Sequence, residues 1–314
     1  MRSRSASRRA ILKSILGWLA FRRVSSAQPL VSPPADDGVR AILLGLQRSK
    51  VFQRRYRVSC TASALGIPFF QRSDVGGGYA SVELGSFGDT QATALQFAGG
   101  SLPDRAAGLN RFGVFREALV ERSAADHEVA FAGFITSSKE EGLREARKNL
   151  KQTGDGAPVM VAWGGARTGR IWFHARNVDV PASSNWKQAD DLLSGLLREF
   201  SSGQPSTAAS ANASTFLSVM RRAALSTVPS SRFPFLHNGK PYELRTKWHS
   251  TGVMDGEIRN DKGAKTTEFR TVYEAGDRSG LPLRIEYYAR SYLRLTFETD
   301  TSPQAPIPSL FPAG

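Results

Sequence analysis

The histidines are the first candidates for catalysis or metal binding, and their spacing argues against both. His127 and Glu128 form the first half of the zinc-protease pattern H-E-x-x-H, but Phe131 stands where the second histidine is required. That second histidine must lie one helical turn further on to share a metal ion with the first. The remaining histidines show no paired spacing along the chain; they are His174, His237 and His249. We therefore expect surface or turn histidines and no metal site.

Two pairs of carboxylates could in principle divide acid and base roles, as the two carboxyl groups of a glycosidase do. Asp190 and Asp191 are neighbours in an expected helix and therefore point to different helix faces. Asp255 and Glu257 flank a turn expected at Gly256. We expect all four to be solvated surface groups. The alternative is a hydrolytic site that forms only in three dimensions, from two or more of His174, His237, His249, Asp255 and Glu257.

The glycine run and the serines do not match nucleotide-binding or nucleophile motifs. Gly76-Gly77-Gly78 lacks the following Gly-Lys-Ser/Thr of a phosphate-binding loop, and Ser81 stands where a dinucleotide fingerprint needs its third glycine. Ser194 lacks the preceding glycine of a G-x-S-x-G elbow. The glycine run is therefore expected to form a flexible turn between strands, and Ser194 to lie within a helix.

Cys60 is the single cysteine, so one chain cannot form a disulfide, a thiolate metal cluster or a paired redox site. It shares its parity in an alternating run with Tyr56, Val58 and Ala62, which predicts a buried small apolar residue. The alternative is a nucleophilic thiol, which requires an electropositive and partly exposed setting. The chain carries no cofactor motif, and we expect no cofactor.

Aromatic residues are frequent in the expected strands and helices. They could line a hydrophobic or sugar-binding cavity inside a curled sheet, or they could form its core. The set comprises Trp163, Trp172, Trp186, Tyr242, Trp248, Phe269, Tyr273, Tyr287, Tyr288 and Phe297.

The chain of 314 residues has a formal charge of +14, which would suit a nucleic-acid partner if it were clustered in the folded part. Half of this excess positive charge lies in the first 27 residues, outside the expected folded part. Residues 1–27 hold seven basic and no acidic residues, which leaves 35 basic and 28 acidic residues in the remainder. We expect no nucleic-acid partner. The remaining charge either keeps the protein soluble or attracts anionic lipid head groups and acidic envelope polymers.

Residues 7–13, with the sequence Ser-Arg-Arg-Ala-Ile-Leu-Lys, resemble the twin-arginine export signal S-R-R-x-F-L-K, with isoleucine in place of phenylalanine. A modest apolar stretch follows at 15–21, which is too short to span a bilayer and is typical of a signal peptide. The resemblance implies that Arg8 and Arg9 are targeting residues. It also implies that the twin-arginine translocase is a partner during export and carries the chain already folded.

The end of the expected signal supports the same location. Arg22 and Arg23 follow the apolar stretch, where positive charge hinders the general secretory route. The small residues at 25–27 suit a signal peptidase, so the mature chain is expected to begin at Gln28. No later segment is long and apolar enough to be a transmembrane span, and no cysteine is placed to carry a lipid anchor. We expect a soluble bacterial protein in the periplasm or secreted.

Periodicity divides the remaining chain into regions. Residues 28–50 form a proline-rich extension and a helix, because apolar residues recur at helical spacing between 36 and 50. Residues 51–200 form a β-rich first half, with strands expected at 56–65, 79–84, 128–136, 159–163 and 170–180. Helices are expected at 138–154, which opens with a capping box, and at 186–200. The segment 108–122 is ambiguous between helix and strand, and 164–169 is expected to be a turn.

The Ser- and Ala-rich residues 201–214 are expected to form a linker or loop that divides the chain. A short helix at 215–225 follows, and residues 215–300 are otherwise an antiparallel β half with five expected strands. In the last two strands, Ile285 and Tyr287 are expected to face Leu295 and Phe297 across a hairpin. Residues 301–314 form a Pro-rich tail.

Grouped rather than alternating elements predict an α+β fold, with a large antiparallel curved sheet or half-barrel and three or four helices. Three segments resemble an uncharacterised family of β-rich bacterial envelope proteins, each a domain of unknown function. They are the strand at Tyr56 followed by Val75 to Gly78, the run Asp190 to Ser194, and the run Gly280 to Arg284. The resemblance covers most of residues 52–298 and implies no activity.

These observations favour an exported envelope protein without a catalytic role. It would bind an apolar or amphipathic, lipid-like ligand on its curved sheet, or dock a partner protein. The alternative is a periplasmic hydrolase whose site assembles only in the tertiary structure, and a purely structural role fits equally well.

Overall fold

The computed structural model describes most of the chain after residue 35. The described residues are 36–64, 67–106, 110–121, 127–136, 157–167, 169–181, 184–199, 206–210, 214–237, 240–250, 252–290 and 293–302.

The described residues form fourteen strands, three α-helices and one short 3-10 helix. The first-half strands are β1 Gln47–Ala64, β2 Ile67–Phe87, β3 Thr90–Ser101, β4 Phe112–Glu121, β5 His127–Ile135, β6 Ala157–Arg167, β7 Gly169–Val180 and β8 Ser206–Ser210. The second-half strands are β9 Ser230–His237, β10 Lys240–Ser250, β11 Val253–Asn260, β12 Lys265–Val272, β13 Arg284–Arg290 and β14 Leu293–Thr299. The helices are α1 Asp36–Leu44, η2 Trp186–Gln188, α3 Ala189–Glu199 and α4 Phe216–Ala224.

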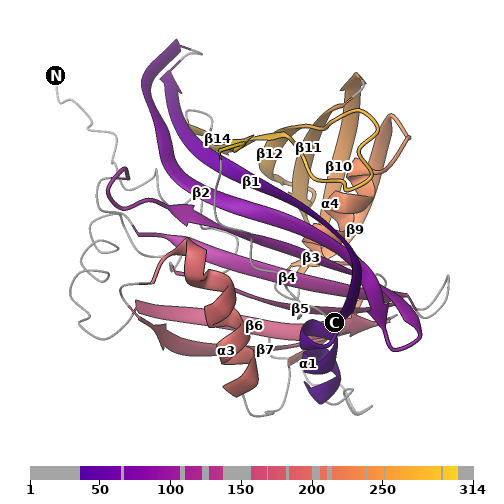
Figure 1. Cartoon of the computed structure of the whole chain (residues 1–314). Coiled ribbons are helices and arrows are strands. Elements are labelled where there is room, and N and C mark those ends of the chain that lie inside the picture. Colours follow the sequence, from indigo (N-terminus) through magenta and orange to yellow (C-terminus); the bar gives the residue numbers. More distant parts are fainter. Residues whose placement is uncertain are drawn as a thin grey trace.

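All fourteen strands belong to one antiparallel sheet, in the order β8-β7-β6-β5-β4-β3-β2-β1-β14-β13-β12-β11-β10-β9. Strand β1 pairs with β14 through partners such as Val58 and Phe297, which joins the two halves of the chain into a continuous surface. In this order β8 and β9 are the two edges of an open sheet. The sheet curls strongly (Figure 1), and the described fold is mostly β with few helices.

One face of the first half is covered by α1, η2 and α3. Apolar residues of these helices, including Leu43, Leu193 and Leu197, pack on alternate residues of β2 to β7 such as Val114 and Phe134. Figure 1 shows α3 and α1 lying across the strands of this half. Burial of this continuous apolar layer is the main stabilising contribution to the first half.

The opposite, concave face of the sheet carries α4. Its Val219 and Ala223 pack against Phe235, Leu244 and other apolar residues of β9 to β12. Leu217 of the same helix packs with a second apolar group, which includes Val82 of β2 and Leu95 of β3. Because the sheet curves around α4, one short helix contacts strands from both halves.

The structure confirms most of the expected strands and helices. The final hairpin has the expected register, since Ile285 lies opposite Phe297 and Tyr287 opposite Leu295. The expected curved antiparallel sheet is present, although the share of strand is larger than an α+β fold suggests. The ambiguous segment 108–122 contains strand β4.

The glycine run was wrongly expected to be a turn. Gly76, Gly77 and Gly78 lie inside β2 and pair with both β1 and β3. Close packing explains why glycine is needed there, because a Cβ on Gly77 would lie 2.8 Å from the indole of Trp186. Glycine is required at Gly77 because it has no side chain and leaves room for the indole, and not because the backbone needs an unusual conformation.

Three further boundaries differ from expectation. Helix α1 ends at Leu44 and β1 begins at Gln47, so the expected helix to residue 50 is too long. The expected linker at 201–214 contains β8, which pairs with β7 at the sheet edge. Strand β6 continues through the expected turn at 164–169 as far as Arg167, because both of its neighbours continue the pairing.

Several predictions lie outside the described residues. They concern the export signal at 1–27 with Arg8 and Arg9, the helix at 138–154, and most of the tail at 301–314.

Candidate functional site

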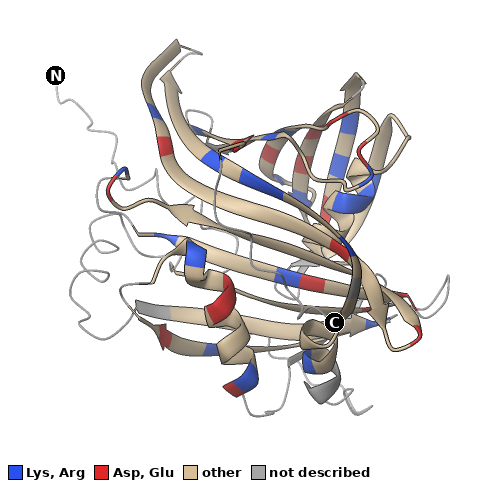
Figure 2. Ribbon diagram, viewed as in Figure 1, with Lys and Arg blue, Asp and Glu red and all other residues tan. Residues whose placement is uncertain are grey.

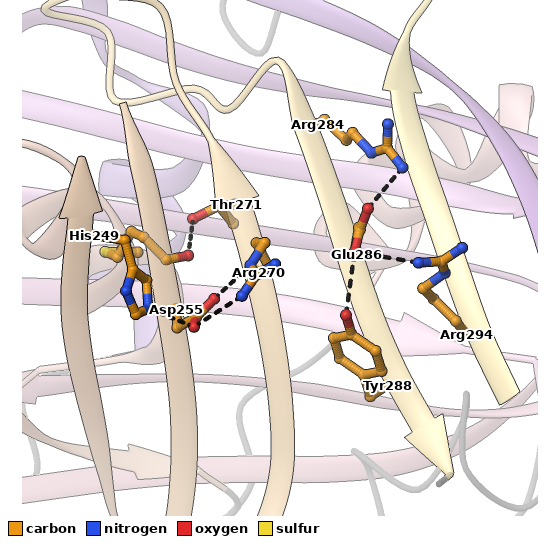
Figure 3. A network of polar contacts seen from close by, with 9 residues as sticks. His249, Asp255, Arg270, Thr271, Arg284, Glu286, Tyr288 and Arg294 are labelled. Carbon is orange, nitrogen blue, oxygen red and sulfur yellow. Dashed lines mark hydrogen bonds and ion pairs between the residues drawn. The ribbon is translucent and has the colours of Figure 1, made fainter. Parts of the chain in front are cut away.

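Two of the residues proposed for a tertiary hydrolytic site do meet. His249 Nε2 of β10 and Asp255 Oδ2 of β11 lie 2.6 Å apart (Figure 3). Both belong to the face of the second half that points away from α4, and their side chains are 41% and 37% exposed. The pair therefore lies on an open sheet surface.

The surroundings of Asp255 favour its ionised form. Arg270 of β12 donates two hydrogen bonds to this carboxylate, at 2.7 and 3.2 Å. These bonds, together with that from His249, lower the pKa of Asp255 below its ordinary value. Within the described residues, no recorded contact of His249 is with a hydroxyl or thiol. No described nucleophile accompanies the pair.

A second polar cluster continues the same face on β13 and β14. Glu286 accepts hydrogen bonds from Arg284 at 2.6 Å and from Tyr288 at 3.1 Å, and its carboxylate lies 3.5 Å from Arg294 (Figure 3). Figure 2 shows bands of basic and acidic residues crossing the second-half strands. Exposed ion pairs of this kind each contribute about 0–1 kcal/mol to folding stability. They make this face hydrophilic but add little to the stability of the protein.

Asp190 was wrongly expected to be a solvated surface group. Its side chain is 4% exposed and forms an ion pair with Arg116 of β4, whose side chain is 1% exposed. Gln96 also donates to this carboxylate, and Ser194 accepts a hydrogen bond from Arg116 at 3.0 Å. Burial raises the pKa of Asp190, an effect that the arginine opposes. The buried pair holds α3 to the sheet.

The next residue along β4, Glu117, performs the corresponding role on the opposite face. Its carboxylate accepts hydrogen bonds from the Thr215 hydroxyl, from the backbone N–H groups of Leu217 and Ser218 at 3.2 and 3.0 Å, and from the Ser218 hydroxyl at 3.1 Å. Burial outweighs these donors and raises the pKa of Glu117. Glu117 thus caps α4 and fixes it in the concave face.

Three of the remaining candidate residues lie in packed or ion-paired settings. Cys60 is half-buried, and burial raises the pKa of its thiol, which disfavours the nucleophilic thiolate. His174 is buried and stacks on Trp163, with ring centroids 5.0 Å apart. Glu257 forms an ion pair with Arg259. The side chains of His127 and His237 lie outside the described set.

The aromatic residues belong to packed clusters. Trp163, Trp172 and Trp186 are buried under the helices of the first half. Tyr242, Trp248, Phe269, Tyr273 and Tyr287 pack around α4, Phe297 packs with the third apolar group, and Tyr288 lies in the polar cluster on the opposite face. Helix α4 therefore covers the second-half aromatic residues inside the curled sheet, where a ligand cavity was one of the two expectations.

An exposed apolar segment at the end of the β1–β2 hairpin was missed from the sequence. Ile67, Phe69 and Phe70 are 70%, 67% and 49% exposed, and Pro68 beside them is also exposed. We call these four residues the hairpin tip. Both faces of the strand are apolar and solvated here, whereas an ordinary surface strand alternates apolar and polar residues.

Strand lengths explain why the hairpin tip is uncovered. Strand β3 pairs with β2 from Phe87 back to Gly76 and no further, so 67–75 has no described strand on that side. The register between β1 and β2 shifts between Val58 and Cys60, where β2 carries extra residues and Asp74 adopts a positive φ of 52°. Such bulges bend and re-aim a strand. Figure 1 shows the hairpin extending beyond the neighbouring strands.

A signal for this segment was available in the sequence. Four apolar residues in succession, at 67–70, follow a strand that alternates cleanly from Tyr56. When consecutive apolar residues follow a strand that alternates apolar and polar residues, the run is either buried on both faces or exposed as an interaction site. The sequence alone does not distinguish these two outcomes, because the answer depends on where β3 ends.

The described residues contain no helix that is both long and apolar enough to cross a membrane. In the same part of the chain, no group of three histidine, cysteine or acidic residues is arranged to hold a metal ion.

Comparisons with known proteins give a structural likeness alone. No family model and no curated protein matches the sequence. Among solved structures, the chain is similar to a β-barrel-like protein of domain of unknown function DUF1849 from Brucella abortus, with 9% sequence identity and a TM-score of 0.40, over 80% of this chain and 98% of that one.

Proposed function

We propose that this chain is an exported bacterial envelope protein that acts by binding an amphipathic, lipid-like partner rather than by catalysis. The observation that carries the proposal is the hairpin tip, where three large apolar side chains are 49–70% exposed. Fully burying each such side chain is worth about 1.5–3 kcal/mol, so a partner that covers the tip gains substantial affinity.

The rest of the fold directs the proposal to this surface. On the concave face, α4 packs against strands of both halves of the sheet. On the other face, α1 and α3 cover the first half. The outer face of the second half is polar and rich in ion pairs. Of the surfaces described, the hairpin tip is the one whose chemistry suits an apolar or amphipathic partner.

Export is part of the proposal and rests on the resemblance of residues 7–13 to a twin-arginine signal. Replacing Arg8 and Arg9 by lysine should leave the full chain in the cytoplasm of a bacterial host, whereas the unchanged chain should be found in the periplasm and shortened by its signal. Export of the double variant at the normal level would contradict the assignment.

Native mass spectrometry of protein recovered gently from the periplasm tests the binding. We expect an added mass that extracts into organic solvent and that is lost when Ile67, Phe69 and Phe70 are replaced by serine. The control replaces Leu225 and Val228, which are 40% and 52% exposed elsewhere on the surface, by serine and should keep the added mass. An identical bare mass for all three proteins would contradict the proposal.

The hydrolase alternative has one observation in its favour, the contact between His249 and Asp255. Screening the purified chain against ester, glycoside and amide substrates, with Asp255→Asn as the control, tests it. Turnover that is lost in the variant would support the alternative. Turnover that is equal in both proteins, or absent, would remove it.

A further inference from the structure

We infer that the partner of the hairpin tip is an anionic lipid bilayer surface, in which the tip inserts at the interface while Arg72 binds the phosphate of a head group. This inference rests on the proposed function and names the partner of the same site.

The apolar residues of the tip suit the boundary between head groups and acyl chains. They lie at the extreme end of the hairpin, on the last pairs that β1 and β2 make, such as Ala64 with Ile67 and Ala62 with Phe70. Interfacial elements bury their apolar residues about 5–10 Å deep. A strand rises about 3.4 Å per residue, so the four residues 67–70 span that depth.

The first charged residue behind the tip is basic. Arg72 is exposed and lies two residues from Phe70, which places it about 7 Å further from the end of the strand. When Phe70 is inserted, this guanidinium lies at the level of the lipid phosphates, which it can bind through its planar set of donors. Asp74 lies beyond the bulge and is 3.4 Å from Arg105, so it does not oppose binding at the level of Arg72.

The charge nearest the tip favours anionic over neutral lipid. Residues 47–73 contain six basic residues and no acidic residue, whereas the chain after residue 27 has a net charge of +7. Figure 2 shows basic residues along β1. Those on β1 do not act at the tip, because Arg54 pairs with Glu274 and Asp277, Arg57 lies 3.6 Å from Asp300, and even Arg57 is seven residues, or about 24 Å, behind Ala64. Arg72 is the basic residue that lies within about one Debye length of an inserted tip, and it attracts an anionic surface there.

The free edge of β2 raises a second possible occupant, a strand from another copy of the chain. The edge is poorly suited to that partner. Pro68 has no N–H to donate to a neighbouring strand, and the bulge next to Asp74 interrupts the regular ladder. Proline and bulges are the devices by which proteins prevent strand addition at an edge. The side chains of the tip, rather than its backbone, are left to make the contact.

Vesicle flotation with the mature chain tests the inference. The probes are vesicles of phosphatidylcholine alone and vesicles that also contain phosphatidylglycerol. We expect binding to the mixed vesicles that weakens as salt is raised. Serine at positions 67, 69 and 70 should reduce binding by more than about tenfold, since one buried apolar side chain already exceeds 1.4 kcal/mol. Serine at Leu225 and Val228 should not change it.

The variant Arg72→Gln tests the head-group contact. One basic residue near an anionic surface contributes about 1 kcal/mol, so we expect a roughly fivefold loss on mixed vesicles and no change on neutral ones. Equal binding to both kinds of vesicle would overturn the inference of an anionic partner but keep an amphipathic one. Absence of vesicle binding, with a tip-dependent lipid adduct in native mass spectrometry, would likewise overturn this inference and leave the proposed function standing. Tip-dependent self-association without vesicle binding would instead identify a second copy of the chain as the occupant.

Discussion

Removal of the Glu117 carboxylate should detach α4 from the concave face of the sheet. In the intact protein this group accepts two backbone N–H bonds and two hydroxyl bonds at the start of α4. Thr215 precedes the helix but makes no side-chain capping bond of its own. In Glu117→Ala, the first turn of α4 therefore keeps no recorded side-chain cap.

The magnitude follows from those contacts. Loss of a helix cap costs about 1 kcal/mol, and each buried donor left without a partner costs about 1–3 kcal/mol. We expect Glu117→Ala to lower the free energy of unfolding by about 3 kcal/mol, within the range of buried polar losses. Glu117→Gln keeps the shape and one acceptor oxygen, and should cost about 1–2 kcal/mol.

Urea unfolding followed by tryptophan fluorescence provides the measurement. Glu199→Gln is the control, because Glu199 is a glutamate that lies exposed on α3, away from α4, and its effect should stay within about 0.5 kcal/mol. If Glu117→Ala also stayed within that margin, the carboxylate would not hold α4 in place, and the account of the concave face would be wrong.

The same variants carry a pH signature. Burial raises the pKa of Glu117, so the folded state favours its protonated form. Stability should therefore fall as pH rises through the raised pKa in the intact protein, and this part of the pH dependence should vanish in Glu117→Gln. An unchanged pH dependence would contradict the assigned burial.

Three further predictions use the same unfolding measurement. Arg116→Met should lower the free energy of unfolding by about 3–5 kcal/mol, because Asp190 is left buried without its partner. Adding Asp190→Leu should restore most of that stability. If it does not, packing rather than charge is responsible for the loss. Gly77→Ala should lower the free energy of unfolding by about 1–3 kcal/mol, because the added Cβ meets the indole ring of Trp186. Gly195→Ala adds its Cβ in open space on α3 and should raise the free energy of unfolding by about 0.5–1 kcal/mol. Equal effects of the two substitutions would contradict the close packing at Gly77. Because the pKa of Asp255 is lowered in the folded state, its carboxylate stabilises the protein at neutral pH, and this stabilisation is lost as pH falls through the lowered pKa. Asp255→Asn should therefore make stability less dependent on pH in the acid range. If the acid range of the stability profile is the same in the variant, the contact is refuted.

Much of the sheet could be predicted from alternation of apolar and polar residues. The last hairpin is the clearest case, because apolar residues on one face and opposite charges on the other both require the observed register. The glycine run could not be assigned, because the indole that fills the space over Gly77 comes from a residue more than a hundred positions away. Strand β8 could not be predicted either, because its short sequence of serine, threonine and alanine has no large apolar residue to set an alternating pattern, and it pairs only at the sheet edge.

The chemistry of the polar residues was harder to predict than the fold. Asp190 and Asp191 are identical in type and adjacent in α3, yet Asp190 is buried against the sheet, where Arg116 of β4 pairs with it. His249 and Asp255 were singled out by type, and their contact depends on the pairing of β10 with β11. The hairpin tip was missed because its exposure is set by the length of β3 rather than by its own residues.

The central claim is that the hairpin tip is the surface that contacts an amphipathic partner. A fluorescent label at Phe69→Cys, in a chain whose native Cys60 is replaced by alanine, reports the polarity around the tip directly. A second labelled chain with Val228→Cys serves as the control. On addition of phosphatidylglycerol-containing vesicles or an extract of envelope lipids, we predict a blue shift and stronger emission at position 69 and no change at position 228. An unchanged spectrum at position 69, or equal changes at both positions, would contradict the claim.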